Sequence, residues 1–289
     1  MIVKLGAVAG FLCLCMLAVA VCDSTRFIGV TYRVKNPKIK KRVKFVLLAD
    51  LHNRKYGPHN EKLLAAIEAE RPDFILSAGD LMTSVPEQSM EPAEELVRSL
   101  AKRYPIYYAN GNHEYRIYHD PEKFGPMGEE YRGVLKACGV RLLENESVLL
   151  PAEGIRIYGL DLPMRFYRKL GRRSPGKEEL DGMLGTADGG EYRILLAHNP
   201  AWFEAYAAWG ADLTLSGHVH GGIMRLPWLG GVLSTSLTLF PKYDGGEFEL
   251  GEKRMIVSRG LGSHTIPIRI FNPAELVAVE LLPEDGQRT

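Results

Sequence analysis

The sequence VKFVLLADLH at residues 43–52 joins an apolar run to two polar side chains. The first seven residues are mainly apolar and include β-branched side chains, which is typical of a strand buried on both faces of a sheet. Asp50 and His52 follow this run directly. Open α/β sheets bind their ligands outside the carboxyl ends of the strands. We therefore expect this stretch to bring two metal-binding side chains to the edge of a buried sheet.

The same arrangement of an apolar run followed by polar side chains recurs along the chain. Runs at residues 73–78, 105–109, 192–197 and 212–216 are followed by Asp80, by Asn112 and His113, by His198, and by His218 and His220. Asp, Asn and His are hard-to-borderline ligands that suit Mn, Fe or Zn. Two such ions about 3.5–4 Å apart can hold both oxygens of an in-line displacement. The recurrence predicts a two-metal hydrolytic site built from residues far apart in the sequence.

The chemistry of each side chain indicates a role in such a site. Asp50 and His52 are two residues apart, so both can reach the same ion from one turn. Asp80 follows Gly79, which allows close backbone approach, and its carboxylate suits a bridge between two ions. The other donors are a neutral carbonyl oxygen and three imidazoles, from Asn112, His198, His218 and His220. His113 is left as a general acid or as a positive group that holds the phosphoryl oxygens.

Strands and helices alternate through the rest of the chain. Helices are expected at residues 60–70, 91–103, 127–138, 177–184 and 200–208, and further strands at 155–160, 247–250, 254–258 and 276–282. This alternation is the signature of an α/β layer fold. We expect one α/β domain over residues 43–283, with two sheets face to face, helices outside them and a short tail at 284–289.

The composition excludes some classes of function. The 289 residues are 46% hydrophobic and 25% charged, with a formal net charge of +1. A near-neutral chain without a basic and aromatic groove is a poor nuclease, so the composition argues against nucleic acid as a partner. Of the four cysteines, Cys138 alone lies beyond residue 22, so a disulfide framework within the body of the chain is excluded.

The first 22 residues suggest contact with a membrane. Residues 5–22 are apolar and carry no charge, and as a helix they would span about 27 Å, close to the thickness of a hydrocarbon core. One interpretation is a single-pass anchor in the cell membrane. A second is a signal peptide, because Ala18-Val19-Ala20 has the form of a cleavage site, and the body would then be exported. Lipidation of Cys22 is a third.

A basic segment follows the apolar one, and we expect residues 23–42 to form a linker. Its lysines and arginines, with the adjoining Lys44, have no acidic residue among them from position 33 onward. Such a cluster either holds a domain against anionic lipids or is simply solvated. The positive-inside rule would place this side in the cytoplasm, whereas a cleaved signal would place the body outside. The side of the membrane stays open.

The series D-x-H, GD, GNHE, H and GHxH resembles the calcineurin-like metallophosphoesterase superfamily. The resemblance covers residues 43–282, and the ending GHVHGG with its following segments is similar to the bacterial membrane-associated branch of YkuE-like and YaeI-like phosphodiesterases. It implies a four-layer α/β/β/α sandwich of two mixed sheets. It also implies hydrolysis of phosphoric esters by a metal-bridging hydroxide, with two divalent ions that could be Mn, Fe or Zn.

The resemblance also implies roles for individual residues. The first metal would be held by Asp50, His52, Asp80 and His220, and the second by Asp80, Asn112, His198 and His218. His113 would be the catalytic histidine. Many relatives carry a small residue shortly after the first histidine, whereas this chain has Asn53 and Arg54, which makes these two candidate substrate contacts.

An unusually apolar stretch at residues 223–243 lies beside the expected site. It is either a packed hairpin under the sheet or a lip that meets lipid, for which Trp228, Phe240 and Tyr243 would be suited. With the apolar N-terminus, it favours a lipid-linked or membrane-proximal phosphodiester or pyrophosphate. By resemblance, a pyrophosphate of the UDP-diacylglucosamine type is one candidate. The alternative to an enzyme is a membrane-tethered metal-binding or docking module without catalysis, and the oligomeric state stays open.

Overall fold

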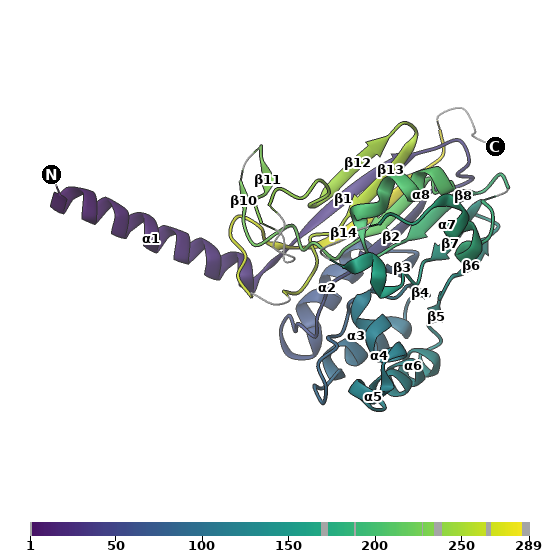
Figure 1. Ribbon diagram of the computed structural model, residues 1–289, viewed down its shortest axis with the longest axis horizontal. Helices are drawn as coiled ribbons and strands as arrows, with labels where there is room; N and C mark the ends of the chain where they lie inside the picture. Colours follow the sequence, from purple (N-terminus) through teal and green to yellow (C-terminus); the bar gives the residue numbers. More distant parts are fainter. Residues whose placement is uncertain are drawn as a thin grey trace.

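Two six-stranded sheets form the centre of the protein (Figure 1). The computed structural model describes residues 2–168, 173–187, 189–226, 228–233, 239–263 and 267–284. The first sheet has the order β1 (Phe27–Lys35), β14 (Ala274–Leu282), β2 (Val43–Leu48), β3 (Phe74–Ser77), β4 (Ile106–Tyr108) and β5 (Arg141–Leu142). The second has the order β12 (Gly246–Leu250), β13 (Lys253–Val257), β9 (Leu213–Ser216), β8 (Tyr192–Leu196), β7 (Ile155–Gly159) and β6 (Glu146–Leu150). The expected tail at 284–289 lies almost wholly outside the described residues.

Helices cover the outer faces of both sheets. One outer layer contains α2 (Glu61–Glu70), α3 (Glu91–Ala101), α4 (Asn112–His119), α5 (Pro121–Phe124) and α6 (Met127–Ala137), and the other contains α7 (Lys177–Leu184) and α8 (Phe203–Trp209). Short 3-10 turns are η1 (Pro58–Asn60), η2 (Met164–Tyr167) and η3 (Pro200–Trp202). A two-stranded hairpin is formed by β10 (Arg225–Leu226) and β11 (Gly230–Gly231).

The side chains of β2 show how the layers pack. Successive side chains of a strand point to opposite faces. Phe45 and Leu47 lie in the core between the two sheets, whereas Val46 and Leu48 lie in the core beneath the outer helices. A third buried cluster joins α7 and α8 to the outer face of the second sheet. The expected four-layer sandwich of two mixed sheets is therefore confirmed.

The strands that carry the expected metal ligands run parallel within each sheet. In the first sheet β2, β3 and β4 are parallel neighbours, and in the second β8 and β9 are. In the first sheet β14 and β2 are antiparallel. In the second sheet the edge strands β6 and β12 are antiparallel to their neighbours β7 and β13. The carboxyl ends of the ligand-bearing strands can therefore meet at one edge of the sandwich.

The segment expected as a basic linker holds an edge strand instead. All nine residues of β1 pair in parallel with β14, from Phe27 opposite Ala274 to Lys35 opposite Leu282. The basic side chains find acidic partners on the domain: Arg33 and Arg42 both bind Glu280, at 3.0 and 2.5 Å. The prediction of a linker was wrong for this strand because its partners, β14 and Glu280, lie far away in the sequence. The composition of the basic segment alone does not indicate them.

Helix α1 (Ile2–Thr25) projects away from the sandwich (Figure 1). Among the residues that the structure describes, no helix is both long and apolar enough to cross a membrane. The spanning anchor therefore stays a prediction without structural support.

The apolar stretch at residues 223–243 lies between β9 and β12 and contains the β10–β11 hairpin. Trp228 is fully exposed and Phe240 is 57% exposed. Tyr243, by contrast, is buried between Phe203 and Phe248 and donates from its hydroxyl to Glu204. The expectation that Tyr243 faces an interface is therefore wrong, because its ring completes the packing against α8 and β12.

Candidate metal centre

Seven side chains that were expected to hold a metal lie just beyond the carboxyl ends of strands in both sheets. Each follows a strand of the pattern seen in the sequence: Asp50 follows β2, Asp80 follows β3, Asn112 begins α4 after β4, His198 follows β8, and His218 and His220 follow β9, with His52 two residues beyond Asp50. All are buried except His218, which is half-buried. Six of these seven side chains, all but that of Asn112, fall into overlapping groups of potential metal ligands.

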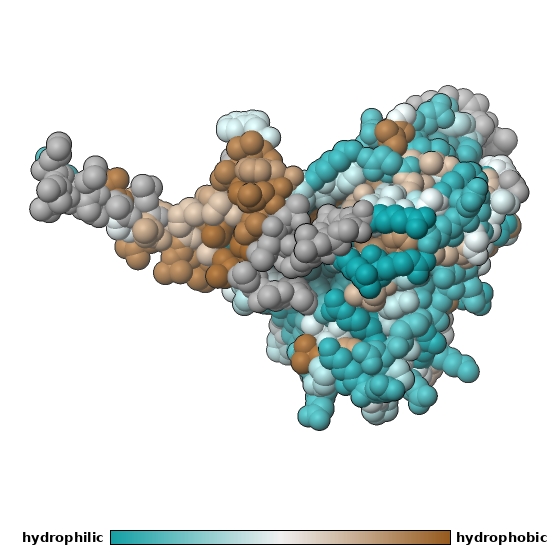
Figure 2. Space-filling view, in the orientation of Figure 1, coloured by the Kyte–Doolittle hydropathy of each residue, from teal (hydrophilic) through white to brown (hydrophobic). Residues whose placement is uncertain are grey.

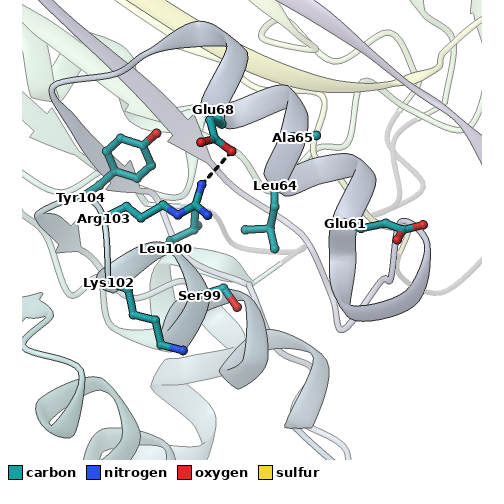
Figure 3. Close-up of a pocket in the computed structure, with 9 residues that line it drawn as sticks. All are labelled: Glu61, Leu64, Ala65, Glu68, Ser99, Leu100, Lys102, Arg103 and Tyr104. Atoms are coloured by element: carbon teal, nitrogen blue, oxygen red, sulfur yellow. Dashed lines mark ion pairs between the residues drawn. The ribbon is translucent and has the colours of Figure 1, made fainter.

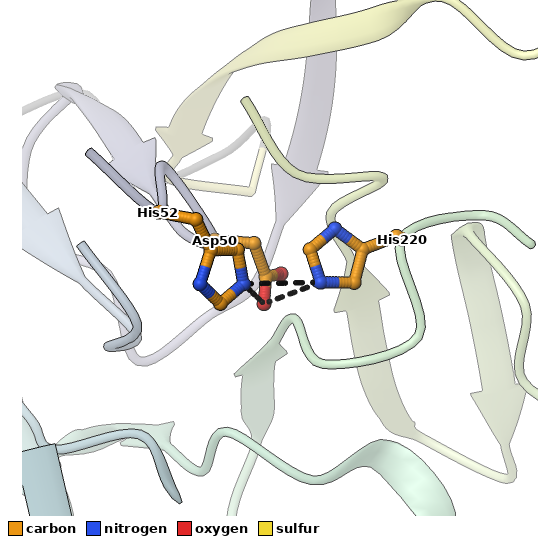
Figure 4. Close-up of side chains that lie close together, drawn as sticks. All are labelled: Asp50, His52 and His220. Carbon is orange, nitrogen blue, oxygen red and sulfur yellow. Dashed lines mark hydrogen bonds and ion pairs between the residues drawn. The ribbon is translucent and has the colours of Figure 1, made fainter. Parts of the chain in front are cut away.

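Asp50, His52 and His220 form the first group of potential ligands (Figure 4). The Nε2 atoms of His52 and His220 lie 3.2 Å apart. Asp50 Oδ1 is 3.7 Å from Nε2 of His52 and 3.4 Å from Nε2 of His220. Three donor atoms from two sheets therefore point at one small volume.

Asp80 lies at the centre of two further groups. One contains Asp80, His198 and His218, and the other contains Asp80, His52 and His113. Asp80 Oδ2 is 3.0 Å from Nε2 of His198 and 4.0 Å from Nε2 of His52. Asp80 thus lies between the histidines of both expected metal positions, as a bridging carboxylate must. His113 also falls within ligand distance of Asp80, so the geometry alone does not separate it from the ligands.

Five of these side chains stand on strained backbone. Positive φ angles of 48° to 73° are found at Asp50, His52, Asp80, His218 and His220. Residues with a Cβ rarely occupy this region, at a cost of about 1–3 kcal/mol each, and such strain gathers at functional sites. The motifs alone carry no sign of it. The sharp turn after each strand is what aims the side chain back across the sheet edge.

Glycines make room for a neighbouring loop and for the Asp50 carboxylate. Gly79 has a φ of 92°, and a Cβ on it would lie 2.0 Å from the backbone nitrogen of Gly111. A Cβ on Gly217 would lie 2.3 Å from Asp50 Oδ2. Because Gly217 has no side chain, the Asp50 carboxylate can approach the next residue and accept a hydrogen bond from the His218 N–H at 2.9 Å.

Glu114 braces the loops of the centre, a role that the motif reading did not assign. Its buried carboxylate accepts hydrogen bonds from the backbone N–H groups of Asp80 (2.8 Å), Leu81 (3.1 Å) and Gly111 (3.0 Å). The Tyr108 hydroxyl donates to it at 2.6 Å. Burial and the nearby Asp80 raise the pKa of Glu114 to about 7. The glutamate of the GNHE sequence therefore ties the turn after β3 to the turn after β4.

Hydrogen bonds at Nδ1 orient the ligand histidines. Nδ1 of His198 lies 2.7 Å from the carbonyl oxygen of Ala78, and Nδ1 of His220 lies 3.2 Å from that of Gly262. A carbonyl oxygen can only accept, so each Nδ1 carries the proton. The unprotonated Nε2 of the neutral ring then faces the centre, as metal coordination requires.

His113 has the opposite arrangement. Its Nδ1 lies 2.7 Å from the backbone nitrogen of Ser84 and 2.9 Å from the hydroxyl of the same residue. A backbone N–H can only donate, so Nδ1 accepts and the proton of the neutral ring is on Nε2. That Nε2 lies 3.9 Å from Asp80 Oδ2. His113 therefore presents an N–H donor to the centre, whereas His198 and His220 present lone pairs.

The charges of the centre balance one another. Burial raises the pKa of Asp50, but neighbouring imidazoles, His220 most of all, hold it well below its ordinary value. Burial likewise opposes the lowering of the Asp80 pKa, which His198 causes. Burial disfavours protonation of His198, yet the two carboxylates raise its pKa to about 9, whereas burial lowers the pKa of His218 to about 3. A bound divalent cation would displace the His198 proton between the carboxylates.

The donor set fits divalent metal ions. It offers two carboxylates, one amide oxygen and imidazole nitrogens, a mixture that suits Mn, Fe or Zn. The Oδ1 atom of Asn112 is buried and accepts no hydrogen bond within the described part of the chain. A buried polar atom without a partner is costly, and a metal ligand bond would satisfy it.

Asn53 and Arg54 are engaged by the protein itself. The Asn53 amide donates to the Thr83 hydroxyl and to the Ser89 carbonyl, both at 3.2 Å. Arg54 donates to the Ser24 carbonyl at 2.8 Å, and its guanidinium lies 5.6 Å from the centre of the Tyr56 ring. Substrate contact by these two residues therefore stays a prediction.

Tyr167 lines the centre and Arg116 acts on it electrostatically, and both were missed in the sequence. The ring of Tyr167, on η2, lies edge-on to His218 with 5.1 Å between centroids. Arg116 lies one turn after Asn112 on α4, and its charge is among those that lower the pKa of His218. Neither residue belongs to a polar cluster at a strand end, so no local signal marked them. They place a phenol and a guanidinium beside the second group of ligands.

A separate groove of about 340 Å³ lies between α2 and α3 (Figure 3). Arg103 crosses it to pair with Glu68 at 2.7 Å, and Tyr104 lines it two residues before β4. The groove thus adjoins the amino end of β4, whereas the metal ligands lie at the carboxyl ends. None of the ligand residues lines it.

Comparison with known proteins yields a family and several bacterial relatives. Residues 43–222 match the family model for calcineurin-like phosphoesterases. An uncharacterized metallophosphoesterase of Campylobacter jejuni is 31% identical over 252 residues, covering 86% of this chain and 61% of the relative. The phosphodiesterase YaeI of Escherichia coli is 26% identical over 83% of this chain and 82% of its own length. The uncharacterized metallophosphoesterase YkuE of Bacillus subtilis is 26% identical over 82% and 78%.

The match extends over most of the sandwich. This chain covers only 61% of the Campylobacter relative and 62% of a similar protein from Helicobacter pylori. The family model nevertheless spans more than half of the 289 residues, and its range contains all seven potential ligands and His113. The chain therefore belongs to the calcineurin-like phosphoesterase family.

Proposed function

We propose that the protein is a two-metal phosphoesterase that cleaves a phosphodiester or pyrophosphate bond. The observation that carries the proposal is the position of Asp80, whose carboxylate faces both groups of ligands while His113 presents an N–H donor beside it. Family membership and the name of the Escherichia coli relative, a phosphodiesterase, support the reaction class.

Each residue has a distinct task in this proposal. Two bound divalent ions would lower the pKa of a water held between them and offset phosphoryl charge. Asp80 spans the two positions, and Asn112 supplies a neutral oxygen that leaves the centre less negative. His113, with its proton on Nε2, donates to the leaving oxygen as a general acid or holds a phosphoryl oxygen. The Ser84 N–H keeps that proton on Nε2.

We further propose that the substrate is lipid-linked or lies at a membrane surface. An apolar outer surface supports this. It consists of exposed side chains of α1, of the hairpin and the segment after it, and of the loop before β14: Phe11, Leu14, Leu17, Val21, Trp228, Leu229, Leu239, Phe240, Ile268 and Phe271. Figure 2 shows apolar side chains gathered along α1 and on the neighbouring hairpin. Exposed apolar patches of this kind mark interaction sites.

The apolar outer surface begins beside the metal centre. The hairpin segment starts three residues after His220, where the Ile223 carbonyl accepts from the N–H of Ile270. The N–H of the adjacent Arg269 donates to the Ser24 hydroxyl at the end of α1. Because these segments adjoin, a lipid at the surface could present its headgroup to the centre. A pyrophosphate of the UDP-diacylglucosamine type is the specific candidate.

The first experiment is hydrolysis by the purified full chain, with Mn, Fe(II), Zn or Co added singly after chelation. Bis-p-nitrophenyl phosphate reports diesterase activity, and UDP-diacylglucosamine in mixed micelles tests the lipid proposal. We expect metal-dependent turnover of the first and faster turnover of the second. No turnover of either substrate with any of the four metals would favour a docking module. Turnover of the first alone would remove the lipid proposal.

A further inference from the structure

The C-terminal end of α1 is hydrogen-bonded to the loop behind the metal centre. Asp23 is buried, and its Oδ2 accepts from the backbone N–H of Asn272 at 3.1 Å. The Ser24 hydroxyl accepts from the backbone N–H of Arg269 at 3.0 Å. The Ser24 carbonyl accepts from Arg54, two residues after the ligand His52. The helix end is therefore joined to residues that lie close to the metal ligands in the fold.

Arg269 is a buried arginine that holds carbonyl oxygens in place. Its guanidinium, in a side chain only 3% exposed, donates to the carbonyls of Gly262 (2.6 Å) and Arg259 (2.8 Å), with longer contacts to Gly260 (3.3 Å) and His220 (3.4 Å). The Gly262 carbonyl also accepts from Nδ1 of His220. Arg269 therefore fixes the group that orients the His220 ring.

Asn272 holds the backbone on both sides of the same turn. Its fully buried amide donates to the carbonyls of His220 (2.8 Å) and Gly222 (2.6 Å). His220 has a φ of 53°, so its backbone needs such support to stay in the left-handed region. Two side chains of one loop thus control both the ring and the backbone of a single ligand.

We infer that Arg269 and Asn272 are positioning residues for His220, and that Asp23 and Ser24 at the end of α1 hold them in register. The inference rests on the proposed function, in which His220 holds the first metal. Partners that orient a ligand histidine are worth roughly 10- to 100-fold in metal affinity. The end of α1 is on this view part of the support of the metal centre.

The test is Mn²⁺ binding to the full chain, followed as metal content per chain at defined free Mn²⁺. Arg269→Lys keeps the charge but loses the planar fork of donors. We expect the affinity of one of two sites to fall roughly 10- to 100-fold, with turnover restored by excess Mn²⁺. Arg193→Lys is the matched control, because Arg193 is equally buried and binds the carbonyls of Gly189 and Gly210 at the far face of the second sheet.

A second pair of variants tests the helix end and covers a failure of Arg269→Lys to fold. Asp23→Ala removes the acceptor for Asn272, and we expect a several-fold loss of affinity at the same site. Arg26→Ala is its control, since it removes only the exposed ion-pair partner of Asp23. If Arg269→Lys folds and its Mn²⁺ affinity is unchanged at both sites, the inference is overturned. If Arg269→Lys does not fold, unchanged affinities in Asp23→Ala overturn it. Wild-type protein that binds two ions but turns over no phosphoester would remove the proposed function alone.

Discussion

The metal centre and the apolar outer surface are opposites in the same molecule. The centre gathers carboxylates and imidazoles, nearly all of them buried, and most stand on backbone with positive φ angles. The outer surface exposes aromatic and aliphatic side chains, with Trp228 fully in solvent. Charged side chains are ordinarily exposed and large apolar side chains ordinarily buried. Each arrangement is therefore unfavourable to the free energy of folding. We propose that the first serves chemistry and the second serves contact with lipid, so changes at the two places should have separate effects.

The largest effect is expected from Asp80→Ala. The change removes the carboxylate shared by two groups of ligands, so both metals lose a ligand. The loss in turnover should exceed the roughly 10⁴-fold that loss of a proton donor can cause. Hydrolysis of bis-p-nitrophenyl phosphate and metal content per chain measure it. Asp181→Ala, which removes a carboxylate from the surface of α7, is the control, and full activity of Asp80→Ala would contradict the assignment.

A smaller and more selective effect is expected from His113→Ala. If His113 acts as a proton donor rather than a ligand, turnover should fall by roughly 10²- to 10⁴-fold while the metal content stays that of the wild type. Loss of a metal together with activity would instead make His113 a ligand, which its distance to Asp80 allows. His59→Ala is a matched change at an exposed histidine on η1.

The outer surface is tested by Trp228→Ser combined with Phe240→Ser. Partial insertion of each ring into lipid should be worth about 1 kcal/mol, so the double variant should lose activity on a vesicle-bound substrate by roughly 10-fold or more. Activity on soluble bis-p-nitrophenyl phosphate should not change. Leu149→Ser, at an exposed leucine of β6, controls for the loss of an apolar side chain. Equal losses on both substrates would show that the surface supports folding rather than contact.

The smallest effect is expected at the rim of the centre. Arg116→Ala should raise KM by roughly two- to fivefold with little change in kcat, because a half-exposed guanidinium contributes at most about 1 kcal/mol to anion binding. Steady-state kinetics measure the two constants separately. Arg98→Ala, on the exposed face of α3, is the control, and a fall in kcat alone would assign Arg116 to the chemical step.

The sequence could predict what depends on local pattern. The helix at 177–184 has the expected bounds, and the polar residues after five strands meet as expected, because carboxyl ends of parallel strands share an edge. The strand β1 was missed because its pairing partner lies 247 residues away. The brace by Glu114 and the support of His220 by Arg269 were missed for a similar reason, since they act on backbone groups of Asp80 and His220, which lie 34 and 49 residues away.

The position of β14 has a consequence for synthesis. β14, the last strand in the described part of the chain, lies between β1 and β2, so these two stay unjoined until β14 has been made. Strand pairing at such a sequence distance is slow, and a chain emerging from the ribosome exposes its N-terminal part first. An interrupted chain that ends before Arg269 would contain every metal donor yet lack the strand beside β2 and the arginine behind His220. Ordered loading of metal is therefore expected to wait until Arg269 and β14 have been made.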